Sequence, residues 1–339
     1  MADSPNAAVV NIRGLVKTFR HGVIAVDGLD LVVEPGQILG LAGPNGSGKS
    51  VTIRSLLGLL RPTAGRICLF GEPLRPGSPV LGRVGALVDG PGFVPHLSGR
   101  KNLLLAARSC GRRVTVSDLD AAVGLAALGP ALDRPYATYS HGMRYRLGLA
   151  RSLLGEPELL LLDEATTGLD PLQGREVRRR IAEVCAEYGT TVVYAAHQLG
   201  EVEEICTHVA VMRRGRLVVN GPLGEILGVE RVLQVDTPEA SLGAQVLESV
   251  PAIRSVRPVA GRSIICAVDG RASAELVSEV VQRLDTAGVE VRAVYRGQSL
   301  DLLYYEVLAG SRIAAERDMG QPDLEATDEE VGRNPVESL

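Results

Sequence analysis

The amino-acid sequence predicts an α/β protein: a mostly parallel sheet with some antiparallel strands, a helical subdomain, and a small α+β domain. Three observations lead to this prediction. Short apolar runs alternate with helical periodicity as far as Gly228, an all-helical stretch interrupts them, and a β-α-β-β-α-β order follows. A chain of 339 residues is long enough for two packed domains.

The first domain is expected at residues 7–228. Strands are expected at residues 9–12, 29–33, 38–42, 65–70 and 83–88, and again at 159–162, 191–195 and 209–212. The helical subdomain is expected at about 91–157, with helices at 103–110, 117–127 and 142–154, and a further helix follows at 175–188. Strands that alternate with helices favour a mostly parallel sheet.

The second domain is expected at residues 229–310 and is predicted to be ferredoxin-like. Its strands are expected at 231–235, 253–258, 263–268 and 289–295, and its helices at 240–249, 272–287 and 299–308. Residues 311–339 contain eight acidic residues, three Arg and few apolar groups. That composition is typical of a disordered acidic tail.

Composition argues against several classes of protein. The net charge is −4 and aromatic residues make up 3% with no Trp, so no nucleic-acid partner is expected. The five Cys are scattered without a C-x-x-C pair, which argues against a disulfide framework or a zinc site. No signal peptide is recognised and no apolar run reaches 18 residues. A role at a membrane would therefore need another chain to supply the spans.

A phosphate-binding loop is predicted at GPNGSGKS, which fits G-x-x-x-x-G-K-[ST] between a predicted strand and a predicted helix. Its backbone amides would surround the phosphates, Lys49 would reach the β- and γ-phosphates, and the Ser50 hydroxyl would ligate Mg²⁺. The residues expected to bind nucleotide here are Gly43, Pro44, Asn45, Gly46, Ser47, Gly48, Lys49, Ser50 and Val51.

An acidic pair, Asp163 and Glu164, ends the apolar strand LLLL. Asp163 is placed to hold the Mg²⁺ that Ser50 also touches, directly or through water. Glu164 is placed to polarise a water for in-line attack on the γ-phosphate. Together with the phosphate loop, this pair predicts a nucleotide hydrolase.

Four further segments resemble the ATP-binding subunit of ABC transporters, and the resemblance covers residues 9–228. The sequence YSHGM, with Ser140, His141, Gly142 and Met143, is similar to the family signature LSGGQ. The sequence GLDP, with Asp170, is similar to its D-loop, His197 to its switch histidine, and Phe19 to the aromatic residue that stacks on adenine. A core position is the alternative for Phe19.

The resemblance implies ATP and Mg²⁺ as ligands and a head-to-tail dimer, formed with a second copy or with another ATPase subunit. ATP on the phosphate loop of one subunit would be covered by Ser140 and Gly142 of the other, at a helix N-terminus. His197 would contact the γ-phosphate. Closure would drive a separate multi-span membrane subunit, so the protein is expected at the cytoplasmic face of the membrane as a peripheral subunit.

Two positions depart from the family pattern. Asp89 stands where a Gln is usual, at the boundary with the helical subdomain, the usual contact with the membrane subunit. An Asp there would still be able to ligate Mg²⁺ or its water, although its side chain is shorter. His141 stands where the first signature Gly is usual. It would crowd the γ-phosphate, attract it if protonated, or be a tolerated surface residue.

The segment VGALVDGPGFVPHLSGRKNLL and the appended domain resemble ATPases of antibiotic export, of the daunorubicin- and bacitracin-resistance types. This resemblance implies export of a drug, a peptide or a lipid. Two alternatives remain: a soluble ABC ATPase without a transport role, and an ATP-sensing regulatory module. The intact Lys49, Asp163, Glu164 and His197 favour an enzyme that turns over ATP.

Overall fold

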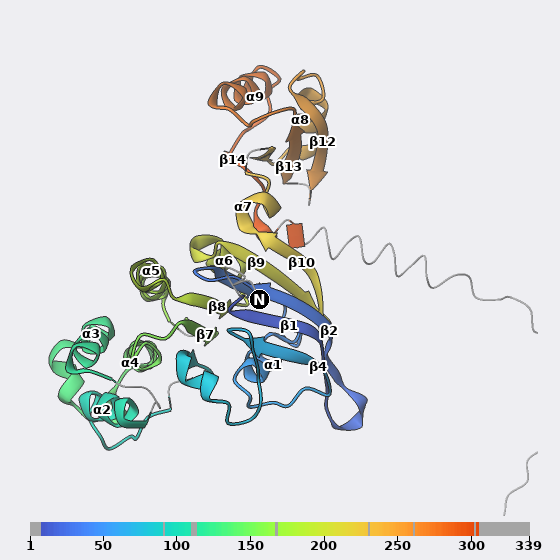
Figure 1. Ribbon diagram of the computed structural model, residues 1–339. Coiled ribbons are helices and arrows are strands. Elements are labelled where there is room, and N and C mark those ends of the chain that lie inside the picture. The colour runs from blue at the N-terminus through green and yellow to red at the C-terminus, as the bar shows by residue number, and fades with distance from the viewer. Residues whose placement is uncertain are drawn as a thin grey trace, which may run out of the picture.

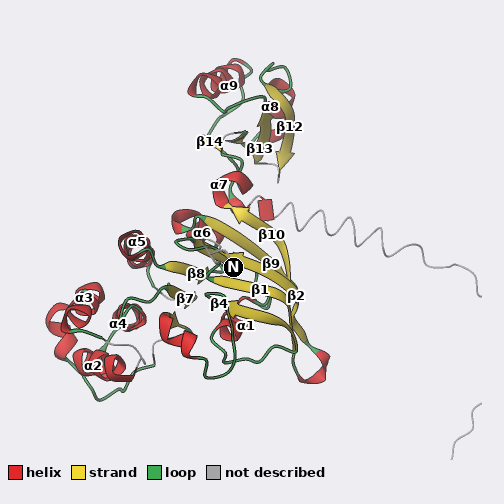
Figure 2. Ribbon diagram, viewed as in Figure 1, coloured by secondary structure: helices red, strands yellow, loops and turns green. Residues whose placement is uncertain are grey.

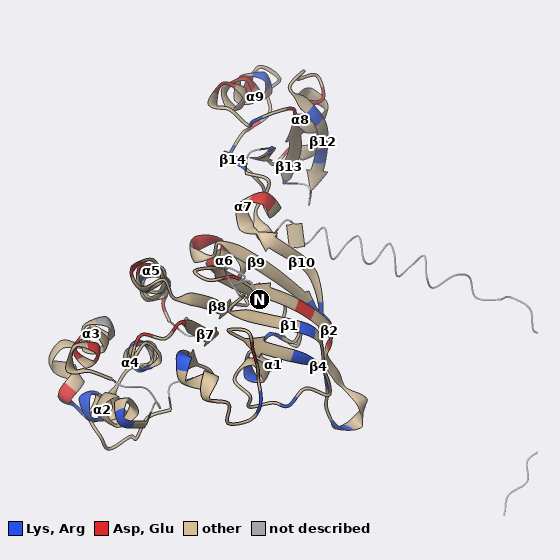
Figure 3. Cartoon of the chain, viewed as in Figure 1, with Lys and Arg blue, Asp and Glu red and all other residues tan. Residues whose placement is uncertain are grey.

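The computed structural model describes residues 8–90, 92–109, 114–166, 169–229, 231–259, 262–301 and 303–304. Two sheets with their helices form the centre, a group of helices lies to one side, and a third sheet with two helices lies at the far end (Figures 1 and 2). Acidic and basic residues occur along all three parts (Figure 3). Within the described residues, no helix is both long and apolar enough to span a membrane.

The first sheet is antiparallel. In spatial order its strands are β2 (Ile24–Val33), β1 (Val10–Thr18), β4 (Ala64–Leu69) and β5 (Glu72–Pro73). Burial alternates along β1, where Val10 and Ile12 are buried and Arg13 is exposed. This alternation is typical of a sheet with one face on the core and the other toward solvent.

The second sheet is the central one. Its order is β10 (Arg216–Pro222), β9 (His208–Arg213), β3 (Ile38–Ala42), β8 (Thr191–Ala195), β7 (Leu159–Asp163) and β6 (Val84–Leu87). All neighbouring strands are parallel except β9 and β10. The four leucines of β7 are fully buried, as expected for a parallel strand covered on both faces. The carboxyl ends of β3, β7 and β8 therefore meet at one edge.

Helices cover both faces of the central sheet. Helix α1 (Lys49–Leu56) lies between the two sheets, where Ile53 packs in one core cluster with residues of β1 and β7. Helices α5 (Pro171–Tyr188) and α6 (Leu199–Ile205) cover the opposite face, where Ile181 and Val202 pack on the sheet.

The helical subdomain has its own core. It contains α2 (Gly99–Ser109), α3 (Val116–Ala126) and α4 (His141–Ser152). Leu103, Ala126 and Leu147 pack together at its centre. Among the described residues, 3₁₀ turns lie at Arg20–Gly22, Pro79–Arg83, Gly129–Asp133 and Tyr136–Thr138.

The C-terminal domain follows α7 (Leu223–Ile226). Its elements are β11 (Val232–Asp236), α8 (Ala240–Leu247), β12 (Ile253–Val259), β13 (Ser263–Val268), α9 (Ala274–Thr286) and β14 (Ala293–Arg296). The sheet order is β12-β13-β11-β14, with every pair antiparallel. This is the order of a ferredoxin-like split β-α-β unit, and the predicted fold class is confirmed.

The chain returns from the C-terminal domain to the central sheet. The Gln298 N–H donates to the Leu227 carbonyl at 2.9 Å, so the exit of the domain lies beside its entry. Leu300 is then fully buried in the same core cluster as Leu199 and Val202 of α6. Its N–H donates to the carboxylate of Glu203, also on α6. The last described segment is thus part of the core of the first domain.

Several elements differ from the sequence-based expectation. β10, α6 and α7 were not predicted, because α6 and α7 are short and β10 alternates over only seven residues. The strand expected at 289–295 is β14, which begins only at Ala293. The predicted tail at 311–339 lies outside the described residues, as do residues 302 and 305–308 of the helix predicted at 299–308. The domain limits stay predictions.

Candidate functional site

The predicted phosphate loop follows β3 directly and ends at α1. Gly43 and Gly48 have φ of 141° and 109°, a region that side chains rarely tolerate. A Cβ on Gly43 would lie 2.2 Å from the Met212 carbonyl oxygen, and one on Gly48 would lie 2.5 Å from the Ala25 carbonyl oxygen. The two glycines therefore let β9 and β2 approach the loop closely, which fixes its shape.

Lys49 is the first residue of α1 and is only 4% exposed. Its Nζ donates to the carbonyl oxygens of Gly43 at 2.7 Å and Pro44 at 3.2 Å. Burial lowers the pKa of Lys49, and the carboxylates of Glu164 and Asp163 act in the opposite direction. The first amides of α1 have no acceptor within the helix. Ammonium and amides together form a site for an anion.

Ser50 and Asp163 meet although they are 113 residues apart, with the Ser50 hydroxyl donating to Asp163 Oδ1 at 3.1 Å. Burial raises the pKa of Asp163, because it disfavours the charged carboxylate, and the Ser50 hydrogen bond opposes the shift. A hydroxyl and a carboxylate at this distance form a donor set that suits Mg²⁺. The residues fit the metal that the sequence implied.

Glu164 has a left-handed backbone, with φ of 52°. Its N–H donates to the Ala195 carbonyl oxygen of β8 at 3.0 Å. A non-glycine residue in this region is strained and persists only where its surroundings hold it. The turn ends β7 immediately after Asp163, and both carboxylates act on Lys49 at the edge of the sheet.

Asp89 pairs with Arg54, which lies one helical turn after Ser50 on α1. Asp89 also has a left-handed backbone, with φ of 57°. The hydrogen bond to Asp89 raises the pKa of Arg54. Asp89 is distant from the phosphate loop in sequence, but its partner belongs to the helix that the loop begins. Its expected role as a Mg²⁺ ligand stays a prediction.

The signature segment forms the start of α4. The Ser140 hydroxyl accepts the Met143 N–H at 3.3 Å and caps the helix. His141 is exposed, and its ring lies 4.7 Å from that of Tyr145. Gly142 is buried, and a Cβ there would lie 2.3 Å from Gln173 Oε1 of α5. The segment therefore presents a capped helix N-terminus at the surface.

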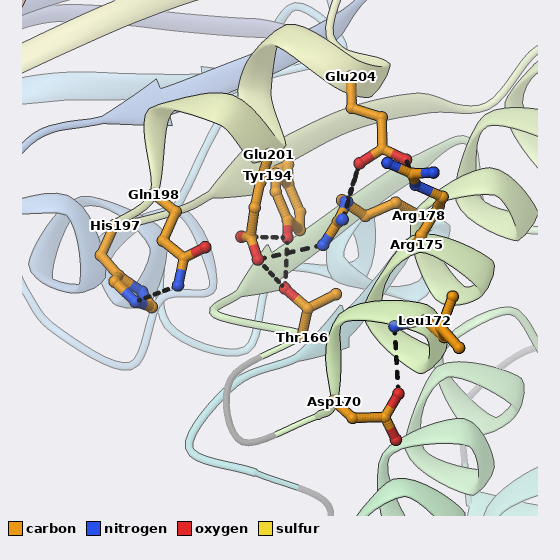
Figure 4. A network of polar contacts seen from close by, with 10 residues as sticks. All are labelled: Thr166, Asp170, Leu172, Arg175, Arg178, Tyr194, His197, Gln198, Glu201 and Glu204. Atoms are coloured by element: carbon orange, nitrogen blue, oxygen red, sulfur yellow. Dashed lines mark hydrogen bonds and ion pairs between the residues drawn. The ribbon is translucent and has the colours of Figure 1, made fainter. Parts of the chain in front are cut away.

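The remaining predicted residues lie on separate loops. Asp170 caps α5, where its Oδ1 accepts the N–H groups of Leu172 at 3.1 Å and Gln173 at 3.0 Å (Figure 4). His197 follows β8, with its Nε2 3.5 Å from the Gln198 side-chain nitrogen. Phe19 is 41% exposed at the end of β1, which disfavours the alternative of a core aromatic. Gly168 of the D-loop lies outside the described residues.

Sequence reasoning missed two sets of residues at this site. One is Arg54, for which the only signal was its position one turn after Ser50. The other is a buried polar cluster of Thr166, Tyr194, Glu201 and Arg178 (Figure 4). Its members come from four different segments, so no local pattern in the sequence indicated it.

Comparisons with known proteins identify the relatives of this chain. A family model described as ABC transporter matches residues 26–167. The bacitracin transport ATP-binding protein BcrA of Bacillus licheniformis is 39% identical over 203 residues, 60% of this chain and 66% of its own length. The daunorubicin/doxorubicin resistance ATP-binding protein DrrA of Streptomyces peucetius is 38% identical over 259 residues, 73% of this chain and 71% of its own length.

One relative matches nearly from end to end. The uncharacterized ABC transporter ATP-binding protein YcbN of Bacillus subtilis is 30% identical over 311 residues, 91% of this chain and 99% of its own length. Among solved structures, CbiO1 of Clostridium perfringens, part of the transporter complex CbiONQ, superposes with a TM-score of 0.58 at 24% identity. That match covers 72% of this chain and 96% of the other, and it establishes the fold. The chain therefore belongs to the ABC transporter family, as an ATP-binding subunit that hydrolyses ATP.

Proposed function

We propose that this protein is the ATPase of an exporter, that it works as a Mg²⁺-dependent dimer, and that it powers a separate membrane subunit. The observation that carries the proposal is the convergence of Lys49, Ser50, Asp163 and Glu164 at the edge of the central sheet. The names of its relatives, which concern bacitracin transport and daunorubicin resistance, favour a hydrophobic drug, peptide or lipid as the cargo.

Ser50 and Asp163 would hold Mg²⁺, which supplies positive charge at the β- and γ-phosphate oxygens when bound. The Lys49 ammonium now caps two carbonyls of its own loop. Phosphate oxygens are better partners for this charge, so we expect it to exchange these carbonyls for the β- and γ-phosphates. Arg54 would hold Asp89 beside the metal site and limit its reach as a ligand.

Glu164 would accept the proton of the attacking water, as its position after the metal-binding Asp163 suggests. Its N–H is fixed on Ala195, so its side chain starts from a defined point at the edge of the sheet. His197 lies two residues after Ala195, the last residue of β8. It would contact the γ-phosphate and the point of attack.

The second half of the site would come from the partner subunit. The α4 N-terminus is exposed at Ser140 and His141, and its amides and hydroxyl suit a terminal phosphate. Asp170 lies at the start of α5 and accepts the Gln173 N–H. The Gln173 side chain in turn lies against Gly142 of α4. We expect the same two helix starts to face the other subunit in the closed dimer.

An open groove of about 650 Å³ lies between the central sheet and the helical subdomain. Val84, Phe93, Asn102 and Arg151 line it. The Arg151 guanidinium lies 4.9 Å from the Phe93 ring centroid. The groove adjoins the segment of Asp89, and we expect the membrane subunit to contact the protein here. The protein would then sit at the cytoplasmic face of the membrane.

The Glu164→Gln variant tests the catalytic part of this proposal. It should bind ATP as the wild type does, lose hydrolysis, and accumulate as an ATP-bound dimer in size-exclusion chromatography. Hydrolysis at the wild-type rate would overturn the role of Glu164. For the transport part, the subunit and its membrane partner reconstituted in vesicles should move a fluorescent hydrophobic drug only with Mg²⁺ and ATP.

A further inference from the structure

A buried hydrogen-bonded cluster lies next to the catalytic edge of the sheet (Figure 4). The hydroxyl oxygens of Thr166 and Tyr194 lie 2.8 Å apart. Thr166 donates to Glu201 Oε1 at 2.9 Å, and Tyr194 donates to Glu201 Oε2 at 2.9 Å. Arg178 Nη1 also donates to Glu201 Oε1, at 3.1 Å. One carboxylate therefore receives two hydroxyls and a guanidinium.

The cluster is well shielded from water. Tyr194 is fully buried and Thr166 is 6% exposed. The side chains of Arg178 and Glu201 are 11% and 12% exposed. Burial strongly raises the pKa of Tyr194, with the Glu201 carboxylate as the second cause. Removing one hydroxyl takes a hydrogen bond from the buried Glu201 carboxylate, and losing a buried hydrogen bond is costly.

The members connect three segments that carry predicted site residues. Thr166 comes two residues after Glu164, and Glu201 comes four residues after His197. Arg178 lies on α5, the helix that Asp170 caps. Glu201 of α6 therefore links the loop after β7, strand β8 and helix α5.

Glu164 is the residue that depends most on this arrangement. Its strained left-handed backbone needs to be held on both sides. On one side its N–H donates to Ala195 of β8. On the other side Thr166 donates to Glu201, the carboxylate that also accepts the hydroxyl of Tyr194, the preceding residue of the same strand. The turn is thus fastened to β8 before and after the carboxylate.

We propose that Thr166, Tyr194 and Glu201 are positioning residues for the Glu164 carboxylate and set its place relative to His197. This inference rests on the role of Glu164 in the proposed function. The competing explanation is that the cluster only stabilises the fold. The two explanations differ in kinetics, because a positioning residue changes the rate of hydrolysis and leaves nucleotide affinity intact.

Thr166→Val and Tyr194→Phe test the proposal. Both remove one hydroxyl and keep the shape of the side chain. A displacement of about 1 Å can cost ~10²-fold in rate, so we expect kcat to fall ~10- to 100-fold. The Kd of a fluorescent ATP analogue should change less than ~3-fold, because the side-chain hydrogen bonds within the cluster join Thr166, Tyr194, Glu201 and Arg178 and not the phosphate-loop residues. Should Thr166→Val fail to fold, Tyr194→Phe decides the question.

Thr190→Val is the matched control. Thr190 is 1% exposed, and its hydroxyl donates to the Pro157 carbonyl at 3.0 Å. This bond joins the starts of β7 and β8, at the end of the sheet away from Glu164. It should lower the Tm about as much as Thr166→Val does and leave kcat within about twofold. If kcat falls in both Thr166→Val and Thr190→Val in proportion to the drop in Tm, the positioning role is overturned.

A double variant gives the second readout. In the Glu164→Gln background, Tyr194→Phe should cause no further loss of the residual hydrolysis, because the carboxylate it positions is gone. Losses that multiply would show that Tyr194 acts independently of Glu164 and would overturn the inference. A Glu164→Gln variant that hydrolyses ATP normally would instead remove the proposed role of Glu164 itself, so the two failures are distinguishable.

Discussion

The first domain and the C-terminal domain differ in what they bury. Among the described residues, the first domain buries nine polar or charged residues, including Lys49, Thr52 and Thr166, whereas the C-terminal domain buries only Gln234 and Thr237. Those two have structural partners: Gln234 accepts the Ser299 N–H at the return of the chain, and Thr237 accepts the Glu239 N–H in a turn. The first domain therefore buries more polar groups, including Ser47, Lys49, Thr52 and Ser55 on the phosphate loop and α1, and the C-terminal domain contributes packing.

The comparison predicts that the largest effect on ATP binding comes from the first domain. Lys49→Ala should weaken ATP binding ~10- to 100-fold, because a charge-assisted contact to the phosphates is lost. Its effect on the Tm of the apo protein should be small, since the ammonium now bonds only to carbonyls of its own loop. Isothermal titration and thermal unfolding measure the two effects. Unchanged affinity would contradict the assignment of the loop.

The opposite result is expected where the C-terminal segment returns. Leu300→Ala should destabilise the first domain by about 2–5 kcal/mol, because it opens a cavity at a fully buried leucine packed on α6. The affinity for ATP should stay within about threefold of the wild type. Denaturant unfolding measures the stability. An exposed-site change such as Leu242→Ala on α8, where the side chain is 46% exposed, is the control and should have little effect.

A smaller effect tests the boundary between the sheet and the helical subdomain. Asp89→Ala removes the partner of Arg54, an exposed pair worth about 1 kcal/mol or less. ATP binding should be nearly intact, while the stimulation of hydrolysis by the membrane subunit should fall. Arg54→Met should have the same effect, and the double variant should be no worse than either single variant. Loss of ATP binding in Asp89→Ala would show that Asp89 belongs to the nucleotide site.

The smallest effect is a pH dependence at the junction. Burial raises the pKa of Glu203 above its ordinary value of 4.5, the Leu300 N–H opposes this shift, and Asp301 adds to it. The native state then holds this proton more tightly than the unfolded state, so stability falls as pH rises from about 4.5 through the raised pKa. Glu203→Gln should lose that fall. Denaturant unfolding at pH 4 and pH 7 (about half a unit below and well above the ordinary value) would measure the free energy of unfolding of both proteins. An equal change between the two pH values in wild type and in Glu203→Gln would contradict the assignment.

The sequence predicted the local parts of the molecule better than the distant contacts. The phosphate loop and the Asp163–Glu164 pair are continuous motifs with conformations that depend on neighbouring residues, such as the glycines at positive φ. By contrast, Arg54 and Asp89, and likewise Thr166 and Glu201, are 35 residues apart. Their pairing depends on which strand ends meet in the folded sheet, and no spacing along the chain encodes that.

The hydrogen bond between Gln298 and Leu227 has a consequence for the evolution and engineering of the chain. Since the two ends of the C-terminal domain touch, the domain is topologically an insertion between α7 and the segment that carries Leu300. Insertions with adjacent ends are readily exchanged, because closing the gap needs few residues and costs little chain entropy. A chain that joins Leu227 to Gln298 through a short Gly-Ser linker would keep the Leu300 contact with α6. In this sense the C-terminal domain is a module whose exchange would leave the packing of Leu300 on α6 in place.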